Sequence, residues 1–438
     1  MRIGRRQTIF LAALLLLFLF RLGFGLCSEF WYEDEQQIYL LGLKFYSTGA
    51  WPYYGPDVTY GIQIPGALQS LLVAVPLFIL PIAEAPFILL NILSFSALCL
   101  LAWYCSRRLP ETPAWIIWAW LLTAPWTVNY STHIVNPSYV LAGSILFFVG
   151  VLETYPQTSR HLISPQWCNF MMGLALFWVM QLHMSWVLLP PYVLVSFYFQ
   201  YKSQGKGILA SLGWFVIGGA ITGSLLLPTF LKYGMVGGIG GAGGTIAFNF
   251  KNVRGMLNLP EGILARFLSF ASFELARFIG DRSVKRLAFL RQQPELIPFV
   301  IFLWAVGIAQ PIVMIIRWFS KNHPQKDWQA IKYLTLFTVL LLYVSFSFAI
   351  KPPSSHTFYV TLPIAFIYSF YCWSPYLSRR GWQIFAGIVI ACGIIFHTGL
   401  AINNLSRISL YVDRSIPQSA IELKDYRGLG ERRPGARY

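Results

Sequence analysis

The strongest constraint on this chain is a succession of long apolar segments separated by short polar loops. Of its 438 residues, 56% are hydrophobic and only 11% are charged. Many segments are long enough for a helix to cross a hydrocarbon core about 30 Å thick. The first, 8–26, follows a basic start but precedes no small-residue cleavage motif, so we interpret it as an uncleaved helix rather than a secretory signal. The sequence therefore predicts an all-α integral membrane protein.

Basic residues in the short loops predict the orientation, because Lys and Arg are retained on the cytoplasmic side. We place the N-terminus inside and expect eleven crossings. The segment 66–82 contains Pro76 and Pro81, and we interpret it as a helix at the outer face or one that enters the membrane only part way. The predicted crossings are 8–26, 86–105, 113–129, 138–153, 168–184, 186–200, 208–230, 296–316, 333–350, 358–374 and 384–401.

This topology makes 1–401 one polytopic domain and places the polar tail 402–438 outside, where we expect it to be loosely ordered. Two large outer loops remain, 27–85 and 231–295. In the second loop the glycine-rich part predicts a mobile lid, and 261–291 predicts an amphipathic surface helix. No soluble catalytic domain is predicted, so any active site must be built from outer loops and helix ends.

Composition weighs against other partners. The net charge of +16 lies in loops and in the tail, where contact with anionic lipid head groups explains it better than nucleic acid does. The 6 cysteines form no CxxC pair and no metal-ligand spacing. Membrane lipids are therefore expected partners, and nucleic acid is not.

An acidic cluster, Glu33 to Glu35, follows the first span in a chain that has few acidic residues. Ile38, Leu41 and Phe45 fall four, seven and eleven residues after Asp34, on the same stripe of a helix. Asp34 would then face a partly dry apolar surface, which raises the basicity of a carboxylate and suits a general base. The alternative is that the cluster only complements the helix dipole.

Further short motifs follow the acidic cluster in a fixed order. Together they are Asp34-Glu35, Gly49 with Trp51-Pro52, Tyr60 to Gly66, Asn136-Pro137-Ser138, Gln181 to Ser185, and Lys351 to Pro363. This set resembles the GT-C class of membrane glycosyltransferases, and within that class it is most similar to the bacterial proteins related to protein O-mannosyltransferases and to the aminoarabinose transferase of lipid A. The likeness covers about residues 8–400 and is strongest in the first 140.

The resemblance implies an inverting transfer of a sugar from a polyprenyl phosphate to a glycolipid, polysaccharide or protein at the outer face of the plasma (inner) membrane. Asp34 would be the catalytic base and Glu35 its neighbour in the site, while Tyr60 and Gln63 would contact sugar or acceptor. Two departures matter. Asn136 stands where the family often has an acidic residue, and Gln63-Ile64 stands where aminoarabinose transferases carry a Lys. The first departure weighs against a bound divalent cation, although such a cation remains a possible cofactor. The second weighs against lipid A as the acceptor.

Cationic and polar residues of the outer loops complete the predicted site. Lys351 and His356, with Tyr359, are candidates for binding the departing lipid phosphate, although Lys351 is also explained by snorkelling to head groups. His133 and Asn136 are candidates for sugar contacts, or members of a plain connecting loop. His183 is a third sugar-contact candidate, or a helix–helix hydrogen bond.

Two other functions remain open. A surface-glycan ligase or polymerase would rely on Arg254, Arg266 and Arg277 of the second loop instead of Asp34. A transporter or flippase of lipid-linked glycans would need polar groups near the midplane and internal repeats, and the sequence has few of either. We also expect Arg21, late in the first span, to snorkel outward rather than pair with a carboxylate.

Overall fold

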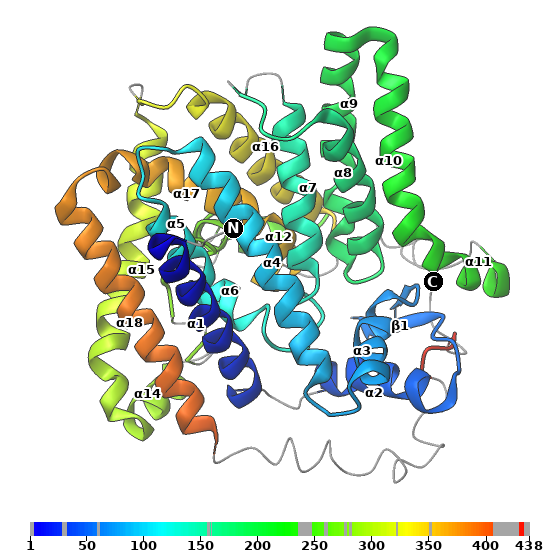
Figure 1. Ribbon diagram of the computed structural model, residues 1–438, viewed down its shortest axis with the longest axis horizontal. Coiled ribbons are helices and arrows are strands. Elements are labelled where there is room, and N and C mark those ends of the chain that lie inside the picture. Colours follow the sequence, from blue (N-terminus) through cyan, green and yellow to red (C-terminus); the bar gives the residue numbers. More distant parts are fainter. Residues whose placement is uncertain are drawn as a thin grey trace.

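The computed structural model describes residues 4–28, 33–58, 62–155, 158, 160–234, 248–257, 262–275, 278–279, 283–320, 323–349, 353–405 and 429–432. Within this part of the chain the fold is a helical bundle with one small antiparallel hairpin, formed by β1 (Tyr54–Val58) and β2 (Ile62–Pro65) (Figure 1). The predicted all-α class is therefore confirmed at this level.

The helices of the first half lie close to the predicted spans. They are α1 (Arg5–Ser28), α2 (Glu33–Thr48), α3 (Leu68–Ile79), α4 (Ala85–Arg108), α5 (Ala114–Thr123), α6 (Pro125–Asn129), α7 (Val140–Thr154), α8 (Pro165–Met180), η2 (Met184–Leu188), α9 (Pro190–Gln204), η3 (Gly205–Gly207) and α10 (Ile208–Gly223).

The second half begins with short helices and ends with long ones. They are η4 (Ser224–Leu226), α11 (Leu227–Tyr233), α12 (Phe250–Met256), α13 (Ile263–Ser269), α14 (Ser283–Gln292), η5 (Pro294–Leu296), α15 (Ile297–Trp318), α16 (Trp328–Ser347), η6 (Ser355–Thr361), α17 (Leu362–Leu377) and α18 (Arg380–Leu405).

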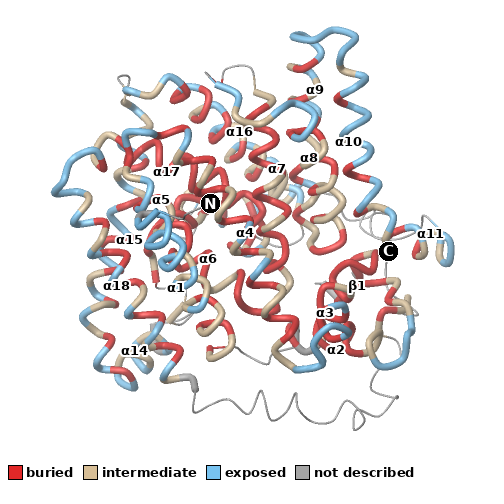
Figure 2. Tube along the Cα trace, viewed as in Figure 1, coloured by how far each residue is buried: buried red, intermediate tan, exposed pale blue. Residues whose placement is uncertain are grey.

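Among the described residues, 6 helical stretches are long and apolar enough to cross a membrane: Gln7–Ser28, Ala85–Arg108, Met184–Tyr233, Pro294–Trp318, Trp328–Ser347 and Arg380–Asn403. Their outward faces are apolar and exposed, as the pale blue on α10, α15 and α18 in Figure 2 shows. Leu16 is 68% exposed and Ile308 is 50% exposed. A soluble protein rarely leaves so large an apolar surface uncovered, so this belt is the surface expected to face lipid. The chain is an α-helical, membrane-embedded protein.

The stretch Met184–Tyr233 turns back on itself, and Figure 1 shows α9 and α10 as a hairpin that projects at the upper right. The turn lies at Gly205, whose φ of 56° favours glycine. α10 packs on α8 through glycines, since a Cβ at Gly173 would overlap the carbonyl oxygen of Phe215 and one at Gly218 that of Phe170. Such close backbone approach through small residues is typical of helices that associate in membranes.

The predicted span 113–129 is interrupted. Pro125 has no N–H to continue α5, and Ala124 before it is extended at ψ 140°, so α5 ends and the short α6 begins. The break leaves carbonyl groups without helical partners inside the bundle. Thr127 Oγ1 donates to the Leu121 carbonyl at 2.6 Å.

Arg21 of α1 donates hydrogen bonds to further polar groups near this break. Its guanidinium donates to the carbonyls of Leu122 and Thr127, both at 2.9 Å, and to Ser131 Oγ at 2.6 Å. Arg21 is fully buried at 0% exposure. The expectation that it snorkels outward is therefore wrong, because the carbonyls freed by the break offer the cation partners inside the bundle.

The predicted amphipathic surface helix at 261–291 is also wrong. The chain there forms two separate helices, α13 and α14, and the residues after α13 enter the bundle, where Phe270 and Phe273 are both fully buried. The irregular backbone finds side-chain partners, because Trp120 Nε1 donates to the Ala271 carbonyl at 3.1 Å and Gln310 Oε1 accepts from the Phe273 N–H at 2.7 Å. Non-helical backbone at membrane depth is tolerated only where protein buries it in this way. The alternation of apolar and charged residues indicated a surface helix and gave no sign of this buried segment.

Unlike the prediction for 261–291, the prediction for 66–82 agrees with the structure, in which this segment forms α3. It has 12 residues, which gives a length of about 18 Å, too short to cross the membrane. It packs against α2, so the first outer loop folds as a compact unit (Figure 1). In the tail, α18 continues to Leu405 and Leu429–Arg432 lie against that unit, while 406–428 and 433–438 lie outside the described residues.

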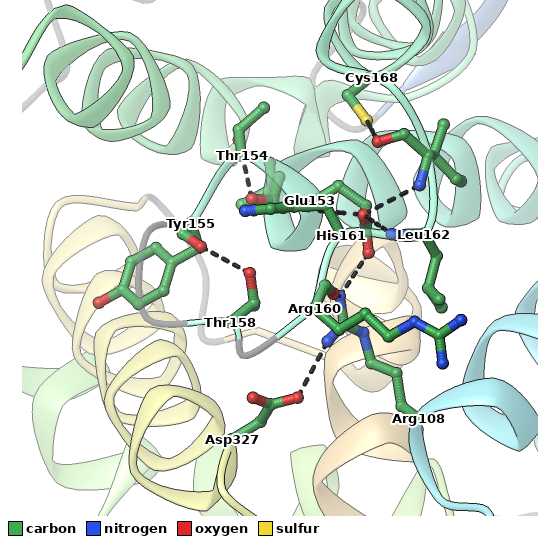
Figure 3. A network of polar contacts seen from close by, with 12 residues as sticks. Arg108, Glu153, Thr154, Tyr155, Thr158, Arg160, His161, Leu162, Cys168 and Asp327 are labelled. Atoms are coloured by element: carbon green, nitrogen blue, oxygen red, sulfur yellow. Dashed lines mark hydrogen bonds and ion pairs between the residues drawn. The ribbon is translucent and has the colours of Figure 1, made fainter. Parts of the chain in front are cut away.

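Three loops that the positive-inside rule places in the cytoplasm meet at one buried cluster (Figure 3). Arg108 forms ion pairs with Glu153 and with Asp327, the latter at 2.9 Å, and donates to the Arg160 carbonyl at 3.0 Å. Glu153 also accepts from the Leu162 N–H at 2.6 Å. The cluster ties α4, α7 and the start of α16 together at the same end of the bundle, which is the end that the sequence places inside.

Removal of Arg108 should destabilise the fold strongly, because it would leave two buried carboxylates without their cation. We expect Arg108→Ala to lower the free energy of unfolding by about 3–5 kcal/mol, measured by thermal unfolding in detergent micelles. Arg107→Ala is the matched control, since Arg107 is exposed, and should change it by less than about 0.5 kcal/mol. Equal melting of the two variants would contradict the role of the cluster.

Candidate functional site

The predicted catalytic carboxylates lie at the start of α2. Ile38 and Leu41, which share the predicted stripe of Asp34, are buried at 0% and 2% exposure. The backbone of Asp34 is helical, and its side chain lies outside the described part of the structure. The Glu35 side chain is buried, at 2% exposure. A buried carboxylate in an apolar helical bundle is costly unless it interacts with a partner, which makes this helix start a functional candidate.

The hairpin and α3 carry the next candidates. Gln63 is buried on β2, and its amide donates to the carbonyl of Glu431 in the C-terminal segment at 3.1 Å. Tyr60 lies outside the described residues. Gly66 follows β2 with φ 106°, a conformation that favours glycine, and a Cβ there would overlap Gln181 Oε1. The first loop is thereby pressed against the end of α8.

Buried amides join this loop to two others. Gln69 of α3 donates to Asn136 Oδ1 at 3.4 Å, so the predicted residue Asn136 lies beside the first loop. Gln181 donates to the Thr222 carbonyl at 2.8 Å. The side-chain oxygens of Gln69 and Gln181 are both buried and accept no hydrogen bond in the described structure. Such acceptors are suited to hydroxyl donors. Gln69 was not among the predicted site residues, because its only distinguishing feature in the sequence is its place in an amphipathic helix.

His183 and His356 approach each other from two short 3-10 helices, because η2 packs against η6. His183 Nδ1 accepts from the Ser185 N–H at 3.1 Å, and Ser354 Oγ lies 3.0 Å from His356 Nε2. His183 is half-buried, and His356 is exposed.

The remaining phosphate-binding candidates differ in their placement. Lys351 lies outside the described residues. Tyr359 is fully buried, and its hydroxyl donates to the Trp126 carbonyl at 3.1 Å, so this donor is engaged within the protein. Arg266 of α13 donates to the carbonyl of Pro353, close in sequence to His356. A guanidinium therefore reaches the loop where the sequence places phosphate binding.

His133 belongs to a buried polar cluster rather than to the exposed rim. It is 5% exposed, its Nδ1 lies 2.7 Å from the Asn129 carbonyl, and its Nε2 lies 3.0 Å from Ser28 Oγ. Asn129 Nδ2 in turn lies 3.1 Å from His397 Nε2, and the Phe24 ring meets both imidazoles edge-on. This arrangement joins α1, the loop after α6 and α18.

The predicted site residues that the structure describes thus come from segments far apart in sequence and gather at one end of the bundle. Within the described residues, no group of three or more His, Cys, Asp or Glu side chains is arranged to hold a metal ion. No protein-family model, curated protein or solved structure matches this chain.

Proposed function

We propose that this protein is a GT-C-like glycosyltransferase that moves a sugar from a polyprenyl phosphate to an acceptor at the outer face of the plasma membrane. The observation that carries the proposal is the gathering of the motif residues. Gly66 lies against Gln181, Asn136 lies beside Gln69, and η2, which follows His183, packs against η6, which contains His356. Loops that only pass between helices have no need to bring amides, imidazoles and a buried carboxylate to the same end.

In the proposed reaction Asp34 is the base. Its carboxylate takes the proton from an acceptor hydroxyl while that oxygen forms a bond to the anomeric carbon. The bond from this carbon to the phosphate oxygen breaks, and the lipid phosphate leaves with the electron pair, so the configuration inverts. Glu35 would support this site from its buried position.

Donor and sugar binding would fall to other residues. His356 and Arg266, together with Lys351, would stabilise the charge on the departing phosphate. The amides of Gln69, Gln181 and Asn136 would bind sugar hydroxyls. The imidazole of His183 suits the same task, since a neutral imidazole offers one donor and one acceptor.

The proposed topology has eleven crossings with the N-terminus inside. The shorter helices α5, α7, α8 and α17 would complete the set of long ones, although α7, with 15 residues, reaches only about 22 Å. Local thinning of the bilayer accommodates such helices at modest cost. The docked tail supports an odd number of crossings, because it lies on the side of the first outer loop, to which α1 leads.

A glycan ligase is the second candidate, favoured by the contact of Arg266 with the Pro353 loop. It would use a lipid-linked glycan at the same outer face, with Arg266 rather than Asp34 as the critical residue. The two functions therefore differ in which substitution abolishes transfer.

The decisive experiment compares variants in membranes supplied with a panel of radiolabelled polyprenyl-phosphate sugars. Asp34→Asn should lower transfer by about 100-fold or more, which is typical of a lost general base. Glu33→Gln, the neighbouring acidic residue, is the matched control and should retain transfer. Transfer that survives in Asp34→Asn but is lost in Arg266→Ala would favour the ligase. No transfer from any donor would remove the support for both enzymes.

Orientation can be tested without activity. A single cysteine in place of His356 or Ser47, in a chain freed of its native cysteines, should react with a membrane-impermeant maleimide added outside intact cells. A cysteine in place of Arg107 should react only after the membrane is opened. Outside labelling of position 107 would overturn the topology.

A further inference from the structure

The C-terminal segment Leu429–Arg432 occupies a cleft formed by the first outer loop and α11. These elements are far apart in sequence, and Figure 1 shows the short red trace of this segment beside α2 and β1. Gly430 is buried, and Leu429 packs against the hydrophobic core. The contacts are specific enough to define a binding site.

The cleft binds the backbone of the segment. The N–H groups of Tyr53 and Tyr54 both donate to the Gly430 carbonyl, at 2.8 and 3.0 Å. Lys44 Nζ donates to the Leu429 carbonyl at 2.7 Å, and the Gln63 amide donates to the Glu431 carbonyl at 3.1 Å. These donors bind main-chain oxygens of a segment that forms a turn at Leu429 and Gly430, so they select its backbone conformation rather than its side chains.

Two side-chain requirements add specificity. Glu431 is bound by Lys232 Nζ at 3.0 Å and by the Tyr233 hydroxyl, and Lys232 lies 4.0 Å above the Tyr53 ring. Gly430 has φ 76°, and a Cβ there would lie 3.1 Å from Pro52 Cα, so a larger residue is excluded by strain and by contact. A glycine followed by a glutamate therefore meets both requirements.

We propose that this cleft is a binding site for a peptide turn containing Gly-Glu, and that its resident ligand is the chain's own segment 429–432. The segment joins the end of the chain to the first outer loop through exchangeable polar contacts. Besides Gln63, the contacts that form the site come from Lys44, Tyr53, Tyr54 and Lys232, which have no role in the proposed glycosyl transfer, so peptide binding can be tested without a sugar donor.

The test uses the full chain and a fluorescent peptide of residues 426–434. Covalent attachment holds the resident segment at an effective concentration near the millimolar range, so the wild-type site should resist the free peptide. In a Gly430→Ala chain the resident segment should leave the cleft. That chain should then bind the free peptide about 10-fold more tightly or better, measured by fluorescence anisotropy.

Matched variants make the result specific. Gly435→Ala, at another tail glycine, should behave like wild type, and Lys232→Ala in the Gly430→Ala chain should weaken peptide binding. A peptide with Ala in place of the glycine or Gln in place of the glutamate should also bind less tightly. If Gly430→Ala does not fold, Glu431→Lys is used in its place. Repulsion between the introduced positive charge and Lys232 should then displace the resident segment from the site. Equal peptide binding by wild-type and vacated chains, or no preference for Gly-Glu, would overturn the proposal.

Discussion

The contact between Arg21 and the break after α5 is the constraint on which the outer end of the bundle depends. A helix can stop inside an apolar bundle only if the carbonyl groups it frees find donors, and Arg21 and Thr127 supply them by donating to the carbonyls of Leu122 and Leu121. Because the break is held, the chain turns early and presents Asn129 and His133 towards α1 and α18. Without the buried cation, the loop that carries Asn136 would have no fixed position.

The two ends of the bundle are built on different principles. At one end, buried ion pairs of Arg108 with Glu153 and Asp327 hold the helices together. The other end combines amides, imidazoles and aromatic rings around a compact loop unit with separate buried charges, among them Arg21 and Glu35. This asymmetry suits a protein that needs rigidity on one side and adaptable hydrogen bonding on the other, because amides can donate to or accept from many partners.

Hydropathy and the positive-inside rule predicted nearly all the long helices and the short outer helix α3, because these patterns follow directly from the cost of exposing polar groups to lipid. They could not predict pairings between distant segments. The partners of Arg21 depend on a proline break in another helix, and the buried course of 270–275 depends on Trp120 and Gln310. For the site, motif order indicated which loops meet, but not that Tyr359 is core or that Arg266 reaches Pro353.

The partners of Arg21 also constrain how the protein is made. They lie 101 to 110 residues later in the chain, so α1 leaves the ribosome well before its cation can be satisfied. At about 5–20 residues per second this interval lasts roughly 5–20 s. During it an arginine within an apolar helix costs up to about 3 kcal/mol on insertion scales. The first helix therefore depends on the insertion machinery, or on a temporary polar partner, until α5 and α6 emerge.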